Sequence, residues 1–115
     1  MAAVMRELPP GTVVHNRYRI LQILGAGGFG VTYKVQDLKE NKVAALKEYM
    51  PLDIARRVPG STEIQPTSEK TREQYQKFYT KFYNEAQTIY NLRGHPNIVE
   101  IQHLFYDNNT VYYVM

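Results

Sequence analysis

The chain of 115 residues contains no cysteine and no tryptophan. Without cysteine it cannot form disulfides or thiolate metal sites, and this fits a reducing compartment, so we expect a cytoplasmic protein. No apolar run approaches the roughly 20 residues that span a bilayer, and the interrupted start Met1–Pro10 is unlike a signal peptide. With 43% hydrophobic and 22% charged residues, the composition indicates one small globular domain without a membrane segment.

A large excess of one charge is also missing, because the net charge is only +3. The basic residues are scattered among acids, so we expect no nucleic-acid partner. The three histidines, at positions 15, 95 and 103, are not at metal-ligand spacings, and we expect no metal site in them. Four basic residues in and after segment 50–70 form either a solvated patch or a surface for a phosphorylated or acidic partner. These are Arg56, Arg57, Lys70 and Arg72.

Alternation of apolar and polar residues, with β-branched and aromatic side chains, predicts five strands. They cover residues 18–24, 31–35, 43–49, 98–105 and 110–115. The first three follow one another closely enough to form an antiparallel meander. The last two are joined through the turn residues Asp107, Asn108 and Asn109.

One long helix is predicted between the third and fourth strands. Segment 50–70 before it is rich in proline and is expected to be irregular, with a short strand at 62–65. Residues 71–74 have the form of a capping box, and Gly94 and Pro96 end the helix. Its apolar face is predicted to carry Tyr75, Phe78, Phe82, Glu85, Ile89 and Leu92. The expected fold class is α+β, a five-stranded antiparallel sheet with one long helix packed on it.

Six residues between the first two strands, Gly25 to Gly30, form a Gly-x-Gly-x-x-Gly string. A dinucleotide-binding fold requires a helix after the glycines, whereas the β-branched and aromatic residues 31–33 favour a strand. A Walker loop would end in Gly-Lys-Ser/Thr, which is absent. Two interpretations remain: a glycine-rich hairpin whose backbone lies close over phosphates, or an ordinary loose hairpin.

Lys47 and Glu85 are candidates for an ion pair. Lys47 shares one face of its strand with the small Ala45, while Leu46 and Glu48 alternate onto the other face. Glu85 lies in the middle of the predicted apolar stripe, where a carboxylate is costly unless it is paired. If the helix packs on the sheet, Lys47 is the natural partner; otherwise Glu85 lies at the edge of the stripe and reaches water.

Taken together, these segments resemble the protein kinase family. The segment 24–30 matches its glycine-rich loop, 43–47 the strand with the ATP lysine, and 82–86 the helix with the lysine's partner. The segments 94–99 and 111–115 look like the turn and strand after that helix and the strand that runs to the hinge. Arg17-Tyr18-Arg19-Ile20, Gly30-Val31-Thr32-Tyr33 and Lys47-Glu48-Tyr49-Met50-Pro51 are similar to bacterial Ser/Thr kinases with an insertion before the helix.

The resemblance implies an N-terminal, ATP-binding lobe. By it, the amides of Gly25 to Gly30 cover the nucleotide phosphates, and Lys47 holds the α- and β-phosphates with Glu85 orienting it. Thr32 stands where the family usually has valine, which is a small departure. The implied catalytic residues are Lys47 and Glu85. The implied cofactor-binding residues are Leu24, Gly25, Ala26, Gly27, Gly28, Phe29, Gly30, Thr32, Ala45, Lys47 and, as gatekeeper, Met115.

The sequence lacks the His-Arg-Asp and Asp-Phe-Gly motifs of the family. We therefore expect residues 1–115 to be an N-lobe with an N-terminal arm at 1–16 and an insertion at 50–70. The ligands for Mg²⁺ and the contacts with the protein substrate are expected in a missing C-lobe. This chain alone is expected to be inactive, since most of the groups that position and neutralise the phosphates are absent. The alternative is a free-standing, non-catalytic nucleotide- or kinase-binding module.

Overall fold

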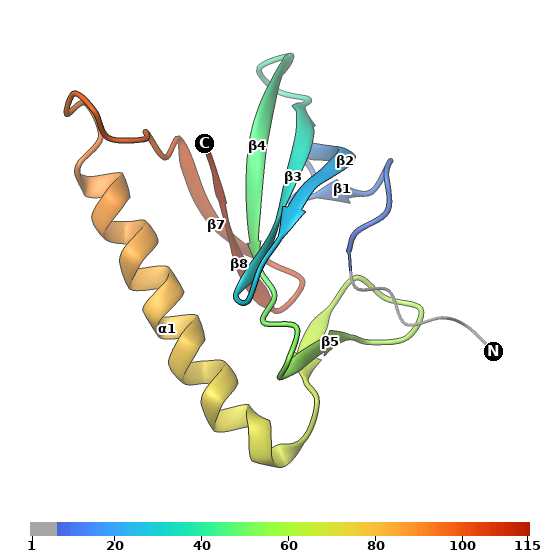
Figure 1. Cartoon of the computed structure of the whole chain (residues 1–115). Helices are drawn as coiled ribbons and strands as arrows, with labels where there is room; N and C mark the ends of the chain where they lie inside the picture. Colours follow the sequence, from blue (N-terminus) through green and yellow to red (C-terminus); the bar gives the residue numbers. More distant parts are fainter. Residues whose placement is uncertain (1–6) are drawn as a thin grey trace.

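Six antiparallel strands form the main sheet of the computed structural model, which describes residues 7–115 (Figure 1). Their spatial order is β1-β2-β3-β4-β8-β7. The bounds are β1 (Val13–Val14), β2 (Tyr18–Ala26), β3 (Gly30–Asp37), β4 (Lys42–Tyr49), β7 (His103–Asp107) and β8 (Thr110–Val114). The predicted fold class is confirmed, and the sheet has one strand more than expected because the short β1 pairs with the start of β2.

The two C-terminal strands form a hairpin whose start differs from the prediction. β7 begins at His103 rather than at residue 98, and residues 98–102 are not in a strand. The turn that joins β7 to β8 consists of Asn108 and Asn109, whose φ angles are 51° and 59°. Two consecutive residues with positive φ are typical of a type I′ hairpin, for which asparagine is well suited. The predicted turn is therefore confirmed.

The helix α1 (Glu69–Asn91) runs beside the sheet and slants away from β4 toward its C-terminal end (Figure 1). It begins two residues before the predicted capping box, and the backbone N–H of Ser68 donates to Thr71 Oγ1 over 3.0 Å. The hydroxyl of Tyr49, at the end of β4, donates to the carbonyl of Tyr75 over 2.8 Å and anchors the N-terminal half of the helix. In residues 7–115 no helix is both long and apolar enough to cross a membrane.

Segment 50–70, predicted to be irregular, contains a small antiparallel hairpin of its own. β5 (Ala55–Arg57) pairs with β6 (Ile64–Pro66), which lies close to the predicted short strand. Asn108 and Asn109 of the β7–β8 turn hold this hairpin, because Ile64 N donates to Asn108 O over 2.9 Å and Asn109 Nδ2 donates to Ile64 O over 2.8 Å. The hairpin is therefore fixed to one end of the main sheet.

The main sheet curls so that side chains near its two edges come into contact. His15, in the turn before β2, stacks on Phe105 of β7 with 4.3 Å between ring centroids. Tyr18 and His103 are joined by a 2.7 Å hydrogen bond. Two of the histidines thus lie near each other, but the described residues hold no group of three or more His, Asp or Glu arranged for a metal ion. Of the expected N-terminal arm, residues 1–6 lie outside the described part.

Candidate functional site

The glycine loop connects β2 to β3 and turns sharply. The amide of Gly27 donates to the carbonyl of Gly30 over 2.9 Å, which closes the turn. Around Gly25, Gly27 and Gly28 an added Cβ would meet no atom within 4 Å, so the backbone there is open to a ligand. At Gly30 the same Cβ would run into the carbonyl oxygen of Glu48. Glycine is required at position 30 because the loop packs directly on β4.

Lys47 lies in the cleft beneath this loop. The cleft measures about 270 Å³, and its walls are Gly25, Ala26, Gly27, Gly28, Phe29, Gly30, Thr32 and Lys47. Thr32 and Lys47 are direct cross-strand partners, so their side chains lie on the same face of the sheet. The structure therefore brings the glycine loop and the strand lysine together.

The three remaining candidates for a nucleotide site, Leu24, Ala45 and Met115, do not line that cleft. Ala45 shares the face of Lys47, and its carbonyl accepts a 2.9 Å hydrogen bond from the amide of Met115. Leu24 precedes the first glycine and is 54% exposed. Ala45 and Met115 are partly buried.

Glu85 reaches a neighbouring small cleft but does not pair with Lys47. A cavity of about 140 Å³ is lined by both residues, together with Phe29, Phe78, Lys81 and Phe82. Among the described residues, the ion pairs within 4.0 Å do not include Lys47 or Glu85. Glu85 is exposed, so of the two interpretations the one in which it lies at the edge of the stripe and reaches water agrees with the structure.

The rotation of α1 about its axis explains this exposure. The helix buries Tyr75 and Ala86 and packs Phe78, Tyr79, Phe82 and Tyr83 against the core. The packed face therefore keeps the predicted Tyr75, Phe78 and Phe82 but extends sideways to Tyr79, Tyr83 and Ala86, so Glu85 falls on its flank.

Two aromatic rings lie near the ammonium group of Lys47. Its Nζ lies 6.0 Å from the ring centroid of Phe82 and 5.9 Å from that of Tyr113, at the outer limit of cation–π attraction. At the tip of the glycine loop, Phe29 contacts Phe78 of α1 with 5.3 Å between centroids. The loop and the helix therefore touch above the lysine, while the lysine itself has only weak partners.

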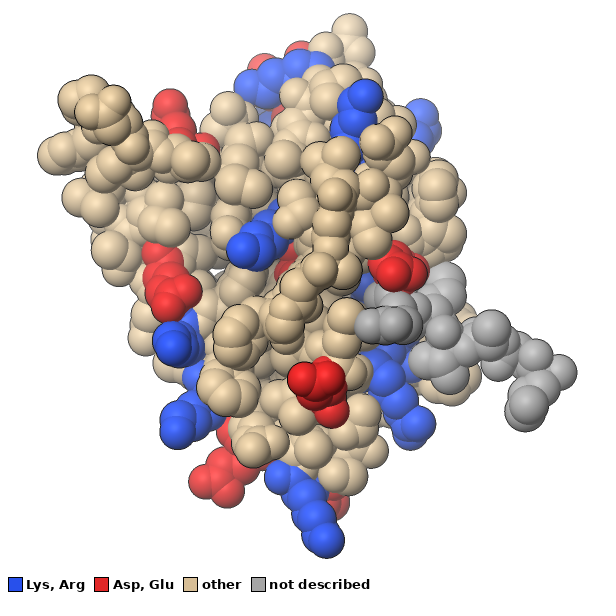
Figure 2. Space-filling model, viewed as in Figure 1, with Lys and Arg blue, Asp and Glu red and all other residues tan. Residues whose placement is uncertain are grey.

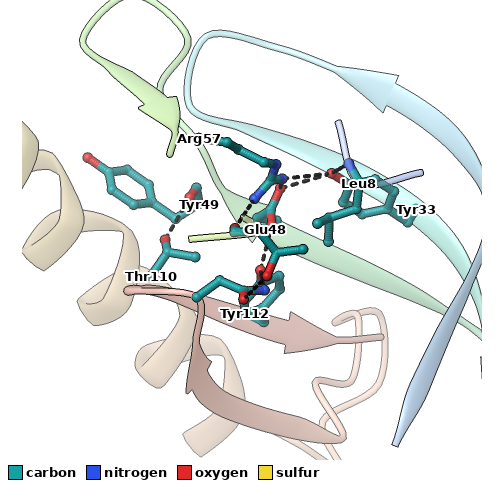
Figure 3. A network of polar contacts seen from close by, with 9 residues as sticks. Leu8, Tyr33, Glu48, Tyr49, Arg57, Thr110 and Tyr112 are labelled. Carbon is teal, nitrogen blue, oxygen red and sulfur yellow. Dashed lines mark hydrogen bonds and ion pairs between the residues drawn. The ribbon is translucent and has the colours of Figure 1, made fainter. Parts of the chain in front are cut away.

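A residue that the sequence analysis did not single out, Glu48, forms the main polar centre of the molecule. Its carboxylate is fully buried. It accepts hydrogen bonds from Arg57 at 2.5 Å, Tyr112 at 2.5 Å and Tyr33 at 2.9 Å (Figure 3). Burial disfavours the charge of Arg57, but the adjacent Glu48 carboxylate raises its pKa overall. Burial, followed by the charge of Glu48, raises the pKa of Tyr112 well above its usual value. One signal was available: Glu48 shares a strand face with the apolar Leu46.

The four basic residues in and after segment 50–70 do not form one patch. Arg57 is 1% exposed and paired with Glu48, so the expectation of a surface role is wrong for this residue. Arg56, Lys70 and Arg72 are exposed, and Arg72 pairs with Glu69 at 3.1 Å. On the face that Figure 2 shows, Lys and Arg are interspersed with Asp and Glu rather than gathered in one broad area.

Comparisons with known proteins add an independent line of observation. No protein-family model matches the chain. The chain is 25% identical over 105 residues to the serine/threonine-protein kinase PknA of Nostoc sp. (strain PCC 7120), covering 90% of this chain and 16% of the relative. It is 28% identical over 102 residues to calcium-dependent protein kinase 19 of Arabidopsis thaliana, covering 89% of this chain and 15% of the relative.

A solved structure shares the fold as well. The chain superimposes on the apo form of PpkA-294 with a TM-score of 0.87 and 28% identity, covering 96% of this chain and 38% of that chain. The curated relatives are much longer, and the chain spans about one-sixth of their length. In sequence and in fold, the chain resembles the N-terminal lobe of bacterial and plant Ser/Thr protein kinases.

Proposed function

We propose that this chain binds the phosphates of MgATP beneath its glycine loop, as the ATP-binding part of a Ser/Thr protein kinase. The observation that supports this most is the shared cleft of the glycine loop, Thr32 and Lys47. The open space around Gly25, Gly27 and Gly28 lets phosphate oxygens come close to the backbone of the loop. The ammonium group of Lys47 adds a positive charge at the floor of the cleft. The residues present therefore fit a triphosphate.

The roles within the site follow the kinase resemblance. Lys47 contacts the α- and β-phosphates, and Glu85 orients it once the helix and the lysine approach each other. By the same resemblance, Leu24, Thr32, Ala45 and Met115 contact the adenine ring. When bound, Mg²⁺ neutralises charge on the phosphates. We propose that its ligands belong to the C-lobe of the whole protein.

For the whole protein, we propose transfer of phosphate from ATP to Ser or Thr hydroxyls of a protein substrate. In that whole protein, residues 1–115 are the N-lobe, with an arm at 1–16 and an insertion at 50–70. The relatives named above are Ser/Thr and calcium-dependent protein kinases, and the chain spans only a part of them. A cytoplasmic location stays a prediction, and no observation favours the free-standing module.

Calorimetric titration of the chain with MgATP tests this proposal. We expect saturable binding that weakens about tenfold or more, equivalent to about 1.4 kcal/mol or more, when Lys47→Ala removes the ammonium group. Lys42→Ala is the matched control, because Lys42 is exposed on the same strand and lies outside the cleft. The proposal fails if the wild-type chain does not bind MgATP, or if both variants bind it as tightly as the wild type.

A further inference from the structure

The position of Lys47 depends on its backbone, because its side chain has few contacts of its own. Its ammonium group forms no ion pair within 4.0 Å among the described residues and lies about 6 Å from two ring centroids. A long side chain held this weakly samples several rotamers. The positions that the ammonium group can reach are therefore set by the position and direction of β4 at residue 47.

The adjacent residue, Glu48, fixes that part of β4 from several sides. Within the ladder, Glu48 pairs with Val31 of β3 and with Tyr112 of β8. Its carboxylate also receives the hydroxyls of Tyr33 from β3 and of Tyr112 from β8. The two strands that flank β4 are thus joined through one buried side chain, one residue away from the lysine (Figure 3).

Arg57 supplies the charge that allows Glu48 to stay buried. Its guanidinium donates to Glu48 Oε1 over 2.5 Å, to the Tyr33 hydroxyl over 3.3 Å and to the carbonyl of Thr62 over 2.8 Å. Both members of the ion pair are at most 1% exposed at the side chain. An unpaired carboxylate at this depth would be strongly unfavourable. The hairpin β5–β6 therefore contributes the counter-ion of the strand that carries Lys47.

The same strand end also supports the glycine loop. The carbonyl of Glu48 lies against Gly30 so closely that a Cβ there would collide with it. Two residues further on, the amide of Met50 donates to the carbonyl of Phe29 over 3.0 Å. Both walls of the cleft, Lys47 on one side and the glycine loop on the other, therefore take their position from the backbone at Glu48.

We propose that Arg57 is a positioning residue for Lys47, acting through Glu48 to fix the strand end and the glycine loop on which nucleotide binding depends. This gives segment 50–70 a specific role, because it delivers Arg57 to the face of the sheet opposite the cleft. The nucleotide part of this inference rests on the proposed function. The position of Lys47 can be measured without it.

The test uses the 115-residue chain with the double substitution E48Q/R57M. This variant removes both buried charges together, which is often tolerated in a protein interior, and the glutamine can still hydrogen-bond the tyrosine hydroxyls. The substitution Arg56→Met is the matched control, since Arg56 lies next to Arg57 on β5 but is exposed. Thermal unfolding establishes that each variant is folded before the other measurements are compared.

Two readouts separate positioning from stability. The first is the NMR signal of Lys47 after dimethylation of the lysines, assigned through Lys47→Arg. We expect the rings of Phe82 and Tyr113, about 6 Å from Nζ, to displace this signal. The second is the dissociation constant for MgATP. We expect folded E48Q/R57M to lose the ring-induced displacement and to bind MgATP about tenfold more weakly. R56M should match the wild type in both.

The other possible results also decide whether Arg57 positions Lys47. A folded E48Q/R57M with an unchanged Lys47 signal and unchanged affinity overturns the inference, because the network would then serve stability alone. If the double variant does not fold, Arg57→Lys takes its place, since a lysine keeps the charge but cannot bridge Glu48, Tyr33 and Thr62 together. An unmoved Lys47 signal in folded R57K likewise overturns it. If the wild type does not bind MgATP, the proposed function fails, whereas the lysine signal still decides whether Arg57 positions Lys47.

Discussion

Lys47 and Glu48 are neighbours on β4, yet their surroundings are opposite. The carboxylate of Glu48 is buried away from solvent and accepts hydrogen bonds from Arg57, Tyr33 and Tyr112. The ammonium group of Lys47 lies in a cleft with open glycine backbone on one side, and no carboxylate is within ion-pair distance among the described residues. Alternation along a strand therefore separates a satisfied structural charge from an unsatisfied one by a single residue.

The difference separates the part of this small domain that stabilises the fold from the part that is available to bind a ligand. A buried hydrogen-bonded ion pair resists rearrangement, since each lost partner leaves a buried polar group behind. A partly exposed lysine beneath a glycine loop keeps its charge available to an anion. Substitutions on the face of Glu48 should therefore lower stability, and substitutions on the face of Lys47 should weaken anion binding.

The substitution Arg57→Ala should have the largest effect on folding. It leaves the Glu48 carboxylate buried without a counter-ion, which costs about 3–5 kcal/mol of unfolding free energy. Urea denaturation followed by circular dichroism measures this loss. The exposed neighbour Arg56 is the control, and Arg56→Ala should change the midpoint little. If both substitutions lowered the unfolding free energy equally, the buried network would contribute no more to stability than an exposed arginine does.

At the contact between the glycine loop and β4, we expect Gly30→Ala to cost about 2–3 kcal/mol. The new methyl group would collide with the carbonyl oxygen of Glu48, so the loop or the strand must shift. Gly28→Ala is the control, since nothing lies within 4 Å of a Cβ there. Thermal unfolding of the two variants distinguishes them, and a stable Gly30→Ala would contradict the close packing.

The substitution Tyr112→Phe removes one hydroxyl from the network and should cost about 1–2 kcal/mol. The Glu48 carboxylate then loses one donor, and the side-chain amide of Asn108 loses its acceptor at 2.8 Å. The matched control is Tyr106→Phe, because Tyr106 is 57% exposed. Chemical denaturation gives the unfolding free energy of both variants. The prediction is contradicted if Tyr106→Phe lowers it more than Tyr112→Phe does.

How far the sequence could predict this arrangement is clear from two glutamates. The rule that a carboxylate on an apolar face must be paired is correct, but we applied it to Glu85, where the helix turned out to expose the side chain. The residue that satisfies the rule is Glu48, whose partner Arg57 comes from a hairpin in segment 50–70. Strand alternation predicted the face of Glu48, whereas no local pattern pointed to the position of Arg57.

The glycine loop, the meander and Lys47 were predictable because they depend on neighbouring residues in the chain. The full width of the packed face of α1 was not, because Phe78, Tyr79, Phe82 and Tyr83 all pack against the core, and how much of the helix is covered depends on distant strands. The same holds for the meeting of His15 with Phe105, which follows from the curl of the whole sheet.

The smallest effect concerns an ion pair at the other end of the sheet. Arg17 donates to both carboxylate oxygens of Asp37 over 2.9 Å, and this contact, aided by the amides of Lys39 and Glu40, holds the pKa of Asp37 well below its usual range. Because the folded-state pKa is lowered, this stabilisation is present above about pH 4, the unfolded value. It is lost as the pH falls toward the folded-state value.

The substitution Asp37→Asn should therefore cost about 1 kcal/mol at neutral pH. The gap between wild type and variant should narrow as the pH falls below about 4, because the carboxyl of the unfolded wild type takes up a proton while that of the folded protein is still charged. Unfolding free energies measured between about pH 2 and pH 7 test this sign. A gap that is constant with pH would mean that the pair contributes nothing through its charge.

The most direct test of the central claim is to follow the backbone amide NMR signals of the chain during titration with MgATP and, separately, with adenosine. Phosphate binding beneath the loop predicts that the signals of Gly25 to Gly30 and Lys47 move saturably with MgATP and much less with adenosine. Unmoved glycine-loop signals, or shifts confined to other parts of the chain, would contradict the assignment of this cleft as a nucleotide phosphate site.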